Sequence, residues 1–134
     1  MSRENVEIAK RWIELSNARD LSAILNILDP DIECFPREGE PEATAFRGRE
    51  AYAKRAQDAL ASFDAYQIDV SECIDLGEYV VVVGQISARG RVSGVPVSDE
   101  EVWLLRFKDG KCLEYRECGT KANALEAAAA GLRG

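Results

Sequence analysis

The sequence predicts one α+β domain in which a cone-shaped, curved antiparallel sheet is wrapped on three N-terminal helices, with a pocket between them. Two observations carry this prediction. Apolar residues recur at helical spacing in the first half of the chain, and between residues 65 and 117 the apolar period changes to two, which is typical of strands. The length of 134 residues fits a single domain spanning 1–134 and leaves no room for two ordinary ones.

Three helices are predicted before the long strands. The first covers about residues 2–18, and Asp20 is placed to cap a second that runs through Leu28. The segment around Pro30 ends this second helix, because a residue that precedes proline resists the helical conformation. A third helix starts near Gly48. The apolar stripes that predict the first and third helices are Ile8, Ala9, Trp12, Ile13, Leu15 and Ser16, and Tyr52, Ala56, Ala59, Leu60 and Phe63.

The strands are predicted from alternation and from turn residues. A short strand is expected at residues 32–35, and residues 36–47 read as a loop. Tyr79–Val83 and Val102–Phe107 form the apolar centres of two long strands. Asp109-Gly110 predicts a tight hairpin between the last two strands.

The order of elements is therefore helix, helix, strand, helix, and then four long antiparallel strands. Thr120 is expected to cap a last helix that ends near Gly131. A sheet of this size needs one face covered, and the three early helices can cover it. Because such a sheet must be strongly twisted, helices on its concave side leave a cavity instead of a flat seam.

Composition excludes several classes of function. The formal net charge is −7, and no cluster of Lys and Arg suggests a nucleic-acid partner. Neither a secretory signal nor a membrane-spanning stretch is visible, so cytoplasm is the expected compartment. The four cysteines form no CxxC pair and are expected to be reduced core thiols.

The chain contains no histidine. This absence removes Ser-His-Asp and Cys-His catalysis and the usual histidine base. No metal site is predicted, because the carboxylates show no ligand spacing, and no cofactor is predicted. Any acid/base chemistry must come from Asp, Glu, Tyr, Lys or Cys.

Several short segments in this order resemble the nuclear transport factor 2-like superfamily, and more narrowly its SnoaL-like, polyketide cyclase-like branch. The resemblance implies the ketosteroid isomerase-like roll, also called cystatin-like, and covers nearly the whole chain. It implies little about function, because the superfamily includes isomerases, cyclases, dehydratases, epoxide hydrolases and non-catalytic binders. The segments are residues 17–21 (NARDL), 28–33 (LDPDIE), 48–50 (GRE), 103–111 (WLLRFKDGK) and 124–127 (ALEA).

The catalytic positions of ketosteroid isomerase are substituted here. The resemblance places that family's tyrosine, base and oxyanion-hole acid at Trp12, Cys34 and Trp103. An indole offers only an N–H donor, and a thiol in an apolar strand is mostly protonated at neutral pH. Whether the protein is an enzyme therefore stays open, but it is not a ketosteroid isomerase by the usual residues.

A pocket walled by large side chains is predicted from alternation and from the resemblance. If Trp103 faces the cavity, Leu105 and Glu101 share its face, and on the last strand Tyr115 and Glu117 share a face with Leu113. The candidate pocket residues are Trp12, Cys34, Tyr52, Arg55, Trp103, Leu105 and Leu113, with Tyr115 and Glu117 as candidate catalytic residues. Each has a plainer interpretation: the tryptophans are often simple core residues, and Arg55 can equally point into solvent.

These residues favour a binding protein for a small, largely apolar molecule with one or two polar groups. One alternative is a SnoaL-like acid/base enzyme of the cyclase, isomerase or hydrolase type, with Glu117 as its proton carrier. In that case a dry Glu117 with Arg55 turned away supports chemistry, whereas a tight pair supports a structural role or a binder with a fixed charge. A second alternative is an interaction module without ligand. A homodimer is also predicted, through an outer sheet face that carries Val80, Val82, Ile86 and Val102.

Overall fold

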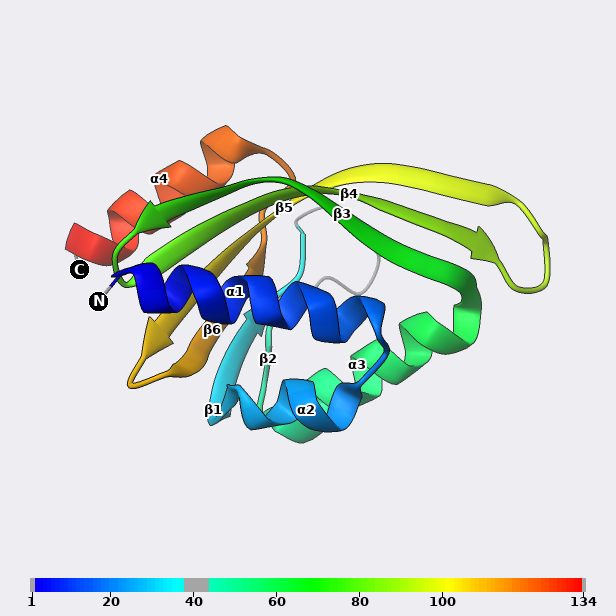
Figure 1. Ribbon diagram of the computed structural model, residues 1–134, viewed down its shortest axis with the longest axis horizontal. Coiled ribbons are helices and arrows are strands. Elements are labelled where there is room, and N and C mark those ends of the chain that lie inside the picture. Colours follow the sequence, from blue (N-terminus) through cyan, green and yellow to red (C-terminus); the bar gives the residue numbers. More distant parts are fainter. Residues whose placement is uncertain (1, 38–43, 134) are drawn as a thin grey trace.

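The computed structural model describes residues 2–37 and 44–133 (Figure 1). The helices are α1 (Ser2–Asn17), α2 (Leu21–Asn26), α3 (Arg49–Ser62) and α4 (Lys121–Arg133). The strands are β1 (Leu28–Phe35), β2 (Phe46–Arg47), β3 (Phe63–Leu76), β4 (Tyr79–Gly90), β5 (Pro96–Lys108) and β6 (Lys111–Glu117). The predicted α+β class and the order of the main elements are confirmed.

The six strands form one curved, unclosed sheet in the order β2-β1-β6-β5-β4-β3 (Figure 1). Most neighbours are antiparallel, as predicted, but β1 and β6 run parallel, with Cys34 opposite Tyr115. The predicted loop over residues 36–47 also contains a short strand, because Phe46 and Arg47 pair with β1. Because β1 and β6 are parallel and the other paired strands are antiparallel, the sheet is mixed.

Helices α1, α2 and α3 lie on the concave side of this sheet, and α1 crosses β3 and β4 (Figure 1). Apolar periodicity explains the packing, because Ala9, Trp12 and Leu15 fall on one face of α1. They join Val80 and Trp103 in the larger of the two buried clusters. The helices thus form one layer and the inner face of the sheet forms the other.

Helix α4 covers part of the opposite face of the sheet, at the end near the N-terminus of α1 (Figure 1). Its Ala124 and Ala128 are fully buried against a second cluster that includes Val81, Val102 and Leu104. Alanines bring the helix close to the strands, because their side chains are small. Both faces of the apolar strand centres are therefore covered within one chain.

This arrangement corrects the surface expected for a homodimer. Val80 and Val82 are fully buried in the inner cluster, and Ile86 packs against the same cluster. Val102 does lie on the outer face, but it is buried with the residues of α4. The expectation failed because strand alternation sends Val80 and Val82 to the helix side, and because α4 was not counted as cover.

Local turn chemistry confirms most of the predicted boundaries. Asp20 accepts a hydrogen bond from the Ala23 N–H at 3.1 Å and so caps α2. Asp109 and Gly110 have φ angles of 52° and 79°, as a type I′ hairpin of two residues requires. The second helix is shorter than predicted, because the Ile27 carbonyl accepts from Cys112 N–H at 2.8 Å and draws the chain into β1.

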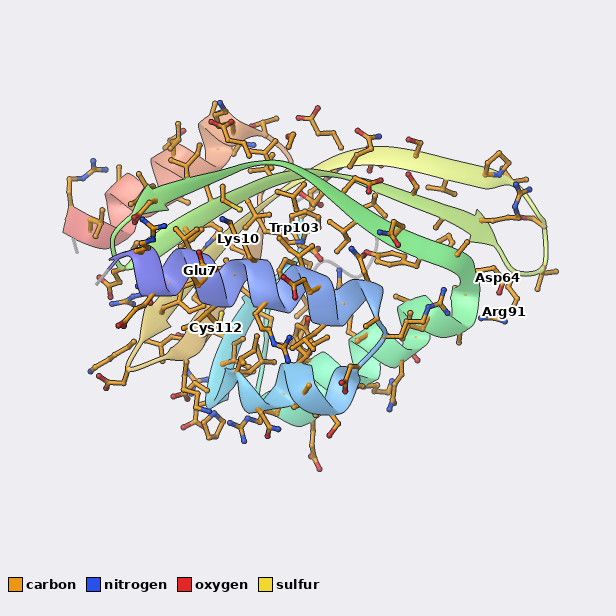
Figure 2. The ribbon with its side chains drawn as sticks, in the orientation of Figure 1. Glu7, Lys10, Asp64, Arg91, Trp103 and Cys112 are labelled. Carbon is orange, nitrogen blue, oxygen red and sulfur yellow. The ribbon has the colours of Figure 1, made fainter. Side chains whose placement is uncertain are left out.

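The hairpin between β4 and β5 is fastened to the end of α3 by Arg91. Its guanidinium donates to the carbonyls of Leu60 and Ala61, both at 2.9 Å, and its Nη1 lies 2.9 Å from Asp64 Oδ1. Figure 2 shows Arg91 and Asp64 beside each other at this end of the molecule. An arginine in this position satisfies carbonyls that the last turn of a helix leaves without partners.

Candidate functional site

A cavity of about 350 Å³ lies between the helices and the concave side of the sheet. It is partly open to solvent, which differs from the enclosed pocket predicted from the sequence. Most of its wall is apolar and comes from all three early helices and from β3, β5 and β6. The lining residues are Trp12, Ser16, Arg19, Leu21, Ile24, Tyr52, Arg55, Ala56, Ala59, Leu60, Phe63, Tyr66, Ile68, Trp103, Tyr115 and Glu117.

The carboxylate of Glu117 is the centre of a hydrogen-bonded network in this wall. Its Oε1 accepts from Arg55 Nη2 at 2.9 Å and from the Arg37 backbone N–H at 3.3 Å. Its Oε2 accepts from the Tyr115 hydroxyl at 3.0 Å, and that hydroxyl accepts in turn from Trp103 Nε1 at 3.1 Å. Groups from β5, β6, α3 and the end of β1 thus hold one carboxylate in place.

Four aromatic rings interlock beside this network. Trp12 Nε1 donates to the Tyr52 hydroxyl at 3.0 Å, which joins α1 to α3. Trp12 also meets Trp103 edge to face with ring centroids 5.5 Å apart, and Tyr115 at 5.8 Å. Tyr52 meets Tyr115 at 5.6 Å in the same geometry. Edge-to-face contacts and filled indole N–H groups make this part of the wall rigid.

The absence of a side chain at Gly84 makes room for the Trp103 ring, which Figure 2 labels. A Cβ atom at Gly84, on the neighbouring strand, would lie 3.4 Å from the ring and 3.0 Å from the Asp69 carbonyl oxygen. Glycine therefore lets the ring and β3 approach this strand closely.

Burial keeps the phenol and thiol groups around the cavity protonated. Burial raises the pKa of Tyr115 well above its ordinary value, and the negative charge of Glu117 adds to this effect. Burial, followed by the charges of Glu117 and Glu101, raises the pKa of Tyr66 to about 12. Burial also raises the pKa of Cys34 to about 12, although Arg55 opposes the shift. These groups are donors near neutral pH and are not nucleophiles.

A second carboxylate, that of Glu101, is buried close to this network. Its Oε1 accepts from the N–H groups of Val102 at 2.8 Å and Gly119 at 2.9 Å. Its Oε2 accepts from Arg37 Nη2 at 2.9 Å. Burial raises the pKa of Glu101, and the two backbone donors and Arg37 counter that effect. Arg37 therefore contacts Glu101 through its side chain and Glu117 through its backbone N–H.

The structure brings six of the nine predicted site residues to the cavity wall. They are Trp12, Tyr52, Arg55, Trp103, Tyr115 and Glu117. Leu105 lines instead a much smaller cavity of about 10 Å³ behind Trp12 and Tyr115. Cys34 is buried in the inner cluster and lines neither cavity.

Leu113 also lines neither cavity, and a β-bulge explains why. Arg106 pairs with Glu114 while Phe107 pairs with Cys112, so Leu113 is the extra residue on β6. The bulge reverses the alternation at this point, and Cys112 takes the inward place expected for Leu113.

Strand phase, which the sequence left open, is settled for β4. Gln85 is exposed, pairs with Asp69, and donates to Ser98 Oγ at 2.8 Å. It therefore does not contribute to the cavity, and neither does Ser87.

Sequence reasoning missed the contributions of Tyr66 and Arg37. Tyr66 lies on the same strand and the same face as Ile68. The period of two along this strand therefore marks Tyr66 as an inward residue and could have identified it as part of the cavity wall. Arg37 gave no such signal, because it stands in a segment without periodicity.

Within residues 2–37 and 44–133, no group of three or more His, Cys, Asp or Glu side chains is arranged to hold a metal ion. No helix in this part of the chain is long and apolar enough to cross a membrane. The four cysteines are free thiols.

The curved sheet, the three helices on its concave side and the cavity between them define a class of small α+β proteins. The sequence model of the SnoaL-like domain matches residues 9–115, and the chain belongs to this family. A search of curated proteins finds no match.

Solved structures show the same fold. An NTF2-like protein from Burkholderia thailandensis E264 is 21% identical with a TM-score of 0.77, covering 92% of this chain and 95% of its own. TerC, co-crystallised with polyporic acid, is 20% identical with a TM-score of 0.77 and coverage of 92% and 96%. A protein with a ketosteroid isomerase-like fold from Catenulispora acidiphila DSM 44928, in complex with trimethylamine, is 13% identical with a TM-score of 0.75 and coverage of 90% of both chains. The resemblance stated from the sequence is thereby confirmed.

Proposed function

We propose that this protein binds a small, largely apolar molecule with one or two polar groups in the cavity between helices and sheet. The observation that carries the proposal is a polar network at one place in an otherwise apolar wall, centred on Glu117. Apolar walls supply the affinity of such sites, and a few fixed polar groups supply orientation. The small ligands crystallised with TerC and with the Catenulispora protein support this use of the fold.

The Arg55–Glu117 pair favours binding over acid/base catalysis. Arg55 Nη2 lies 2.9 Å from Glu117 Oε1, and the Glu117 side chain is 13% exposed. Donors of the protein therefore already engage both oxygens of this carboxylate and hold its side chain in one orientation. A tight pair of this kind fits a structural role, or a binding site whose carboxylate is held in place.

A variant in which a larger side chain fills the cavity tests the proposal. Ala56 lines the cavity on α3, whereas Ala61 is exposed on the same helix and does not line it. We expect Ala56→Phe to lose binding of adamantanol, used as a compact apolar probe, while Ala61→Phe keeps it. Trp12 and Trp103 are the two tryptophans of the chain and both line the cavity, so their fluorescence reports occupation. Equal binding by the two variants contradicts the proposal. Native mass spectrometry of freshly purified protein identifies any natural ligand.

One observation favours a second candidate, an acid/base enzyme of the SnoaL-like kind. The Tyr115 hydroxyl donates to Glu117 Oε2 at 3.0 Å, and both residues line the cavity, so a proton donor and a carboxylate face the same space. The test is Glu117→Gln assayed on the ligand that mass spectrometry identifies. Turnover by the wild type that the variant loses supports the enzyme, and full turnover in the variant removes Glu117 from the mechanism.

A homodimer and a cytoplasmic location stay predictions from the sequence. Light scattering tests the first: a dimer mass at micromolar concentration supports it, and a monomer mass contradicts it.

A further inference from the structure

Glu117 has hydrogen-bonding capacity that the described residues do not fill. Each carboxylate oxygen can accept about two hydrogen bonds. Oε1 already accepts from Arg55 and from the Arg37 backbone, whereas Oε2 accepts only from Tyr115 among the described residues. Tyr115 cannot serve a ligand as donor, because its one O–H is used on Glu117. The Glu117 carboxylate therefore keeps capacity for a further hydrogen bond at Oε2, as an acceptor.

Tyr66 lines the cavity from β3. Its hydroxyl makes no hydrogen bond to any residue in 2–37 and 44–133, although the side chain is half-buried. Tyr66 lines the same cavity as Trp103, Tyr115 and Glu117, so its phenol and the network face one space. Tyr66 offers one donor and one acceptor there.

Both carboxylates at this end of the cavity have an arginine beside them. Glu117 lies 2.9 Å from Arg55, and the buried Glu101 lies 2.9 Å from Arg37. A charged ligand would lose its hydration here without gaining a counter-charge. Arg19 lines the cavity as well, but its side chain is exposed and its charge is screened by water.

We infer that the ligand of the proposed site is neutral and carries a hydroxyl group, which donates to Glu117 Oε2 and accepts from the Tyr66 hydroxyl. This inference rests on the proposed function and narrows it. A hydroxyl is the simplest group that both donates to one partner and accepts from another. An ammonium would leave the Tyr66 O–H without an acceptor, and a carboxylate would leave Glu117 Oε2 without a donor. The rest of the ligand is apolar, to match the wall built by residues such as Ile24, Leu60 and Phe63.

Four probes with one apolar body test this inference: adamantanol, methyladamantane, adamantylamine as the ammonium, and adamantane carboxylate. Their dissociation constants are measured at neutral pH by tryptophan fluorescence for wild type, Tyr66→Phe and Tyr79→Phe. Tyr79→Phe is a matched control, because Tyr79 is buried in the other cluster, on the α4 side of the sheet.

For the wild type we expect adamantanol to bind at least about tenfold more tightly than either charged probe. Tyr66→Phe is expected to weaken adamantanol binding about tenfold and to leave methyladamantane binding unchanged, since the methyl probe makes no hydrogen bond. Tyr79→Phe is expected to change neither.

The other possible results of these measurements distinguish a failure of the inference from a failure of the proposed function. If Tyr66→Phe changes the two neutral probes equally, or changes neither, the inference is wrong while the proposed function stands. Tighter binding of the ammonium or the carboxylate than of adamantanol also overturns the inference alone. If none of the four probes binds with a dissociation constant below about 1 mM, the proposed function itself fails for ligands of this size.

Discussion

The contact between Arg55 and Glu117 orients a carboxylate in the cavity wall more than it stabilises the fold. The two side chains are 39% and 13% exposed, so water screens the arginine while the carboxylate is mostly buried. Pairs of this kind contribute little net free energy of unfolding when one partner faces solvent. A carboxylate in an apolar wall nevertheless needs donors, and three hold this one. These three donors fix the position of the Glu117 side chain in the cavity wall.

At Cys34, burial gives a prediction for alkaline pH. The folded chain holds this thiol proton up to a pKa of about 12, whereas an unfolded chain releases it near the ordinary value of a thiol. The unfolded state therefore binds fewer protons above about pH 9, and the free energy of unfolding falls as pH rises. We expect Cys34→Ala to show a shallower decline between about pH 9 and 11 than the wild type in urea titrations. Parallel declines for the two proteins would contradict this account.

Individual site residues were predictable where alternation was regular. Trp103, Tyr115 and Glu117 reach the cavity as the period of two predicted. Leu113 does not, because the bulge on β6 adds a residue that no local sequence signal marks. The sequence also left the orientation of Arg55 open, since a side chain at the edge of an amphipathic helix face can turn either way, and only its contact with β6 decided it.

At the scale of elements, α3 is held at both ends by groups outside the helix. Gly48 precedes it with a φ of 98°, a conformation that favours glycine, and at its other end Arg91 binds the last carbonyls. Leu60 and Phe63 line the cavity at that same end. The β4–β5 hairpin therefore helps to position one wall of the site, although it contributes no lining residue itself.

We expect Arg91→Ala to release the last turn of α3. Three hydrogen bonds and an exposed ion pair with Asp64 disappear, and the cost to the free energy of unfolding should be about 1 kcal/mol. Amide exchange should quicken between residues 59 and 63 in the variant. Lys54→Ala is the control, because its 3.9 Å pair with Asp58 is highly exposed on the same helix and should matter little. Unchanged exchange at the end of α3 would show that Arg91 does not hold it.

Two features of the elements were not predictable from periodicity. The parallel pairing of β1 with β6 was missed, because a period of two reports that a segment is a strand and not the direction of its partner. The position of α4 was missed because its inward residues, Ala124 and Ala128, are alanines in an alanine-rich segment and mark no clear apolar face. The helices on the concave side, with large apolar residues at regular spacing, were predicted correctly in order and type.

At the scale of the molecule, the sheet separates two apolar layers. The inner cluster joins the sheet to the helices around the cavity, and the outer cluster joins it to α4. Strands β4 and β5 contribute to both, with Val80 and Trp103 on one side and Val81 and Leu104 on the other. The centre of the sheet is therefore packed on both faces.

This separation predicts how binding changes local stability. A ligand in the cavity would contact α2, α3 and the start of β3, because residues of all three line it. Hydrogen–deuterium exchange with adamantanol at saturating concentration should therefore slow in residues 21–26, 49–62 and 63–68, because openings that expose the cavity wall lose the binding free energy. Helix α4 serves as an internal control, since it packs on the opposite face of the sheet and should exchange at the same rate with and without ligand in openings that leave the sheet intact. Slower exchange in α4 with no change in α3 would place the probe outside the cavity, whereas protection confined to the helices around the cavity is what binding between Trp103 and α3 requires.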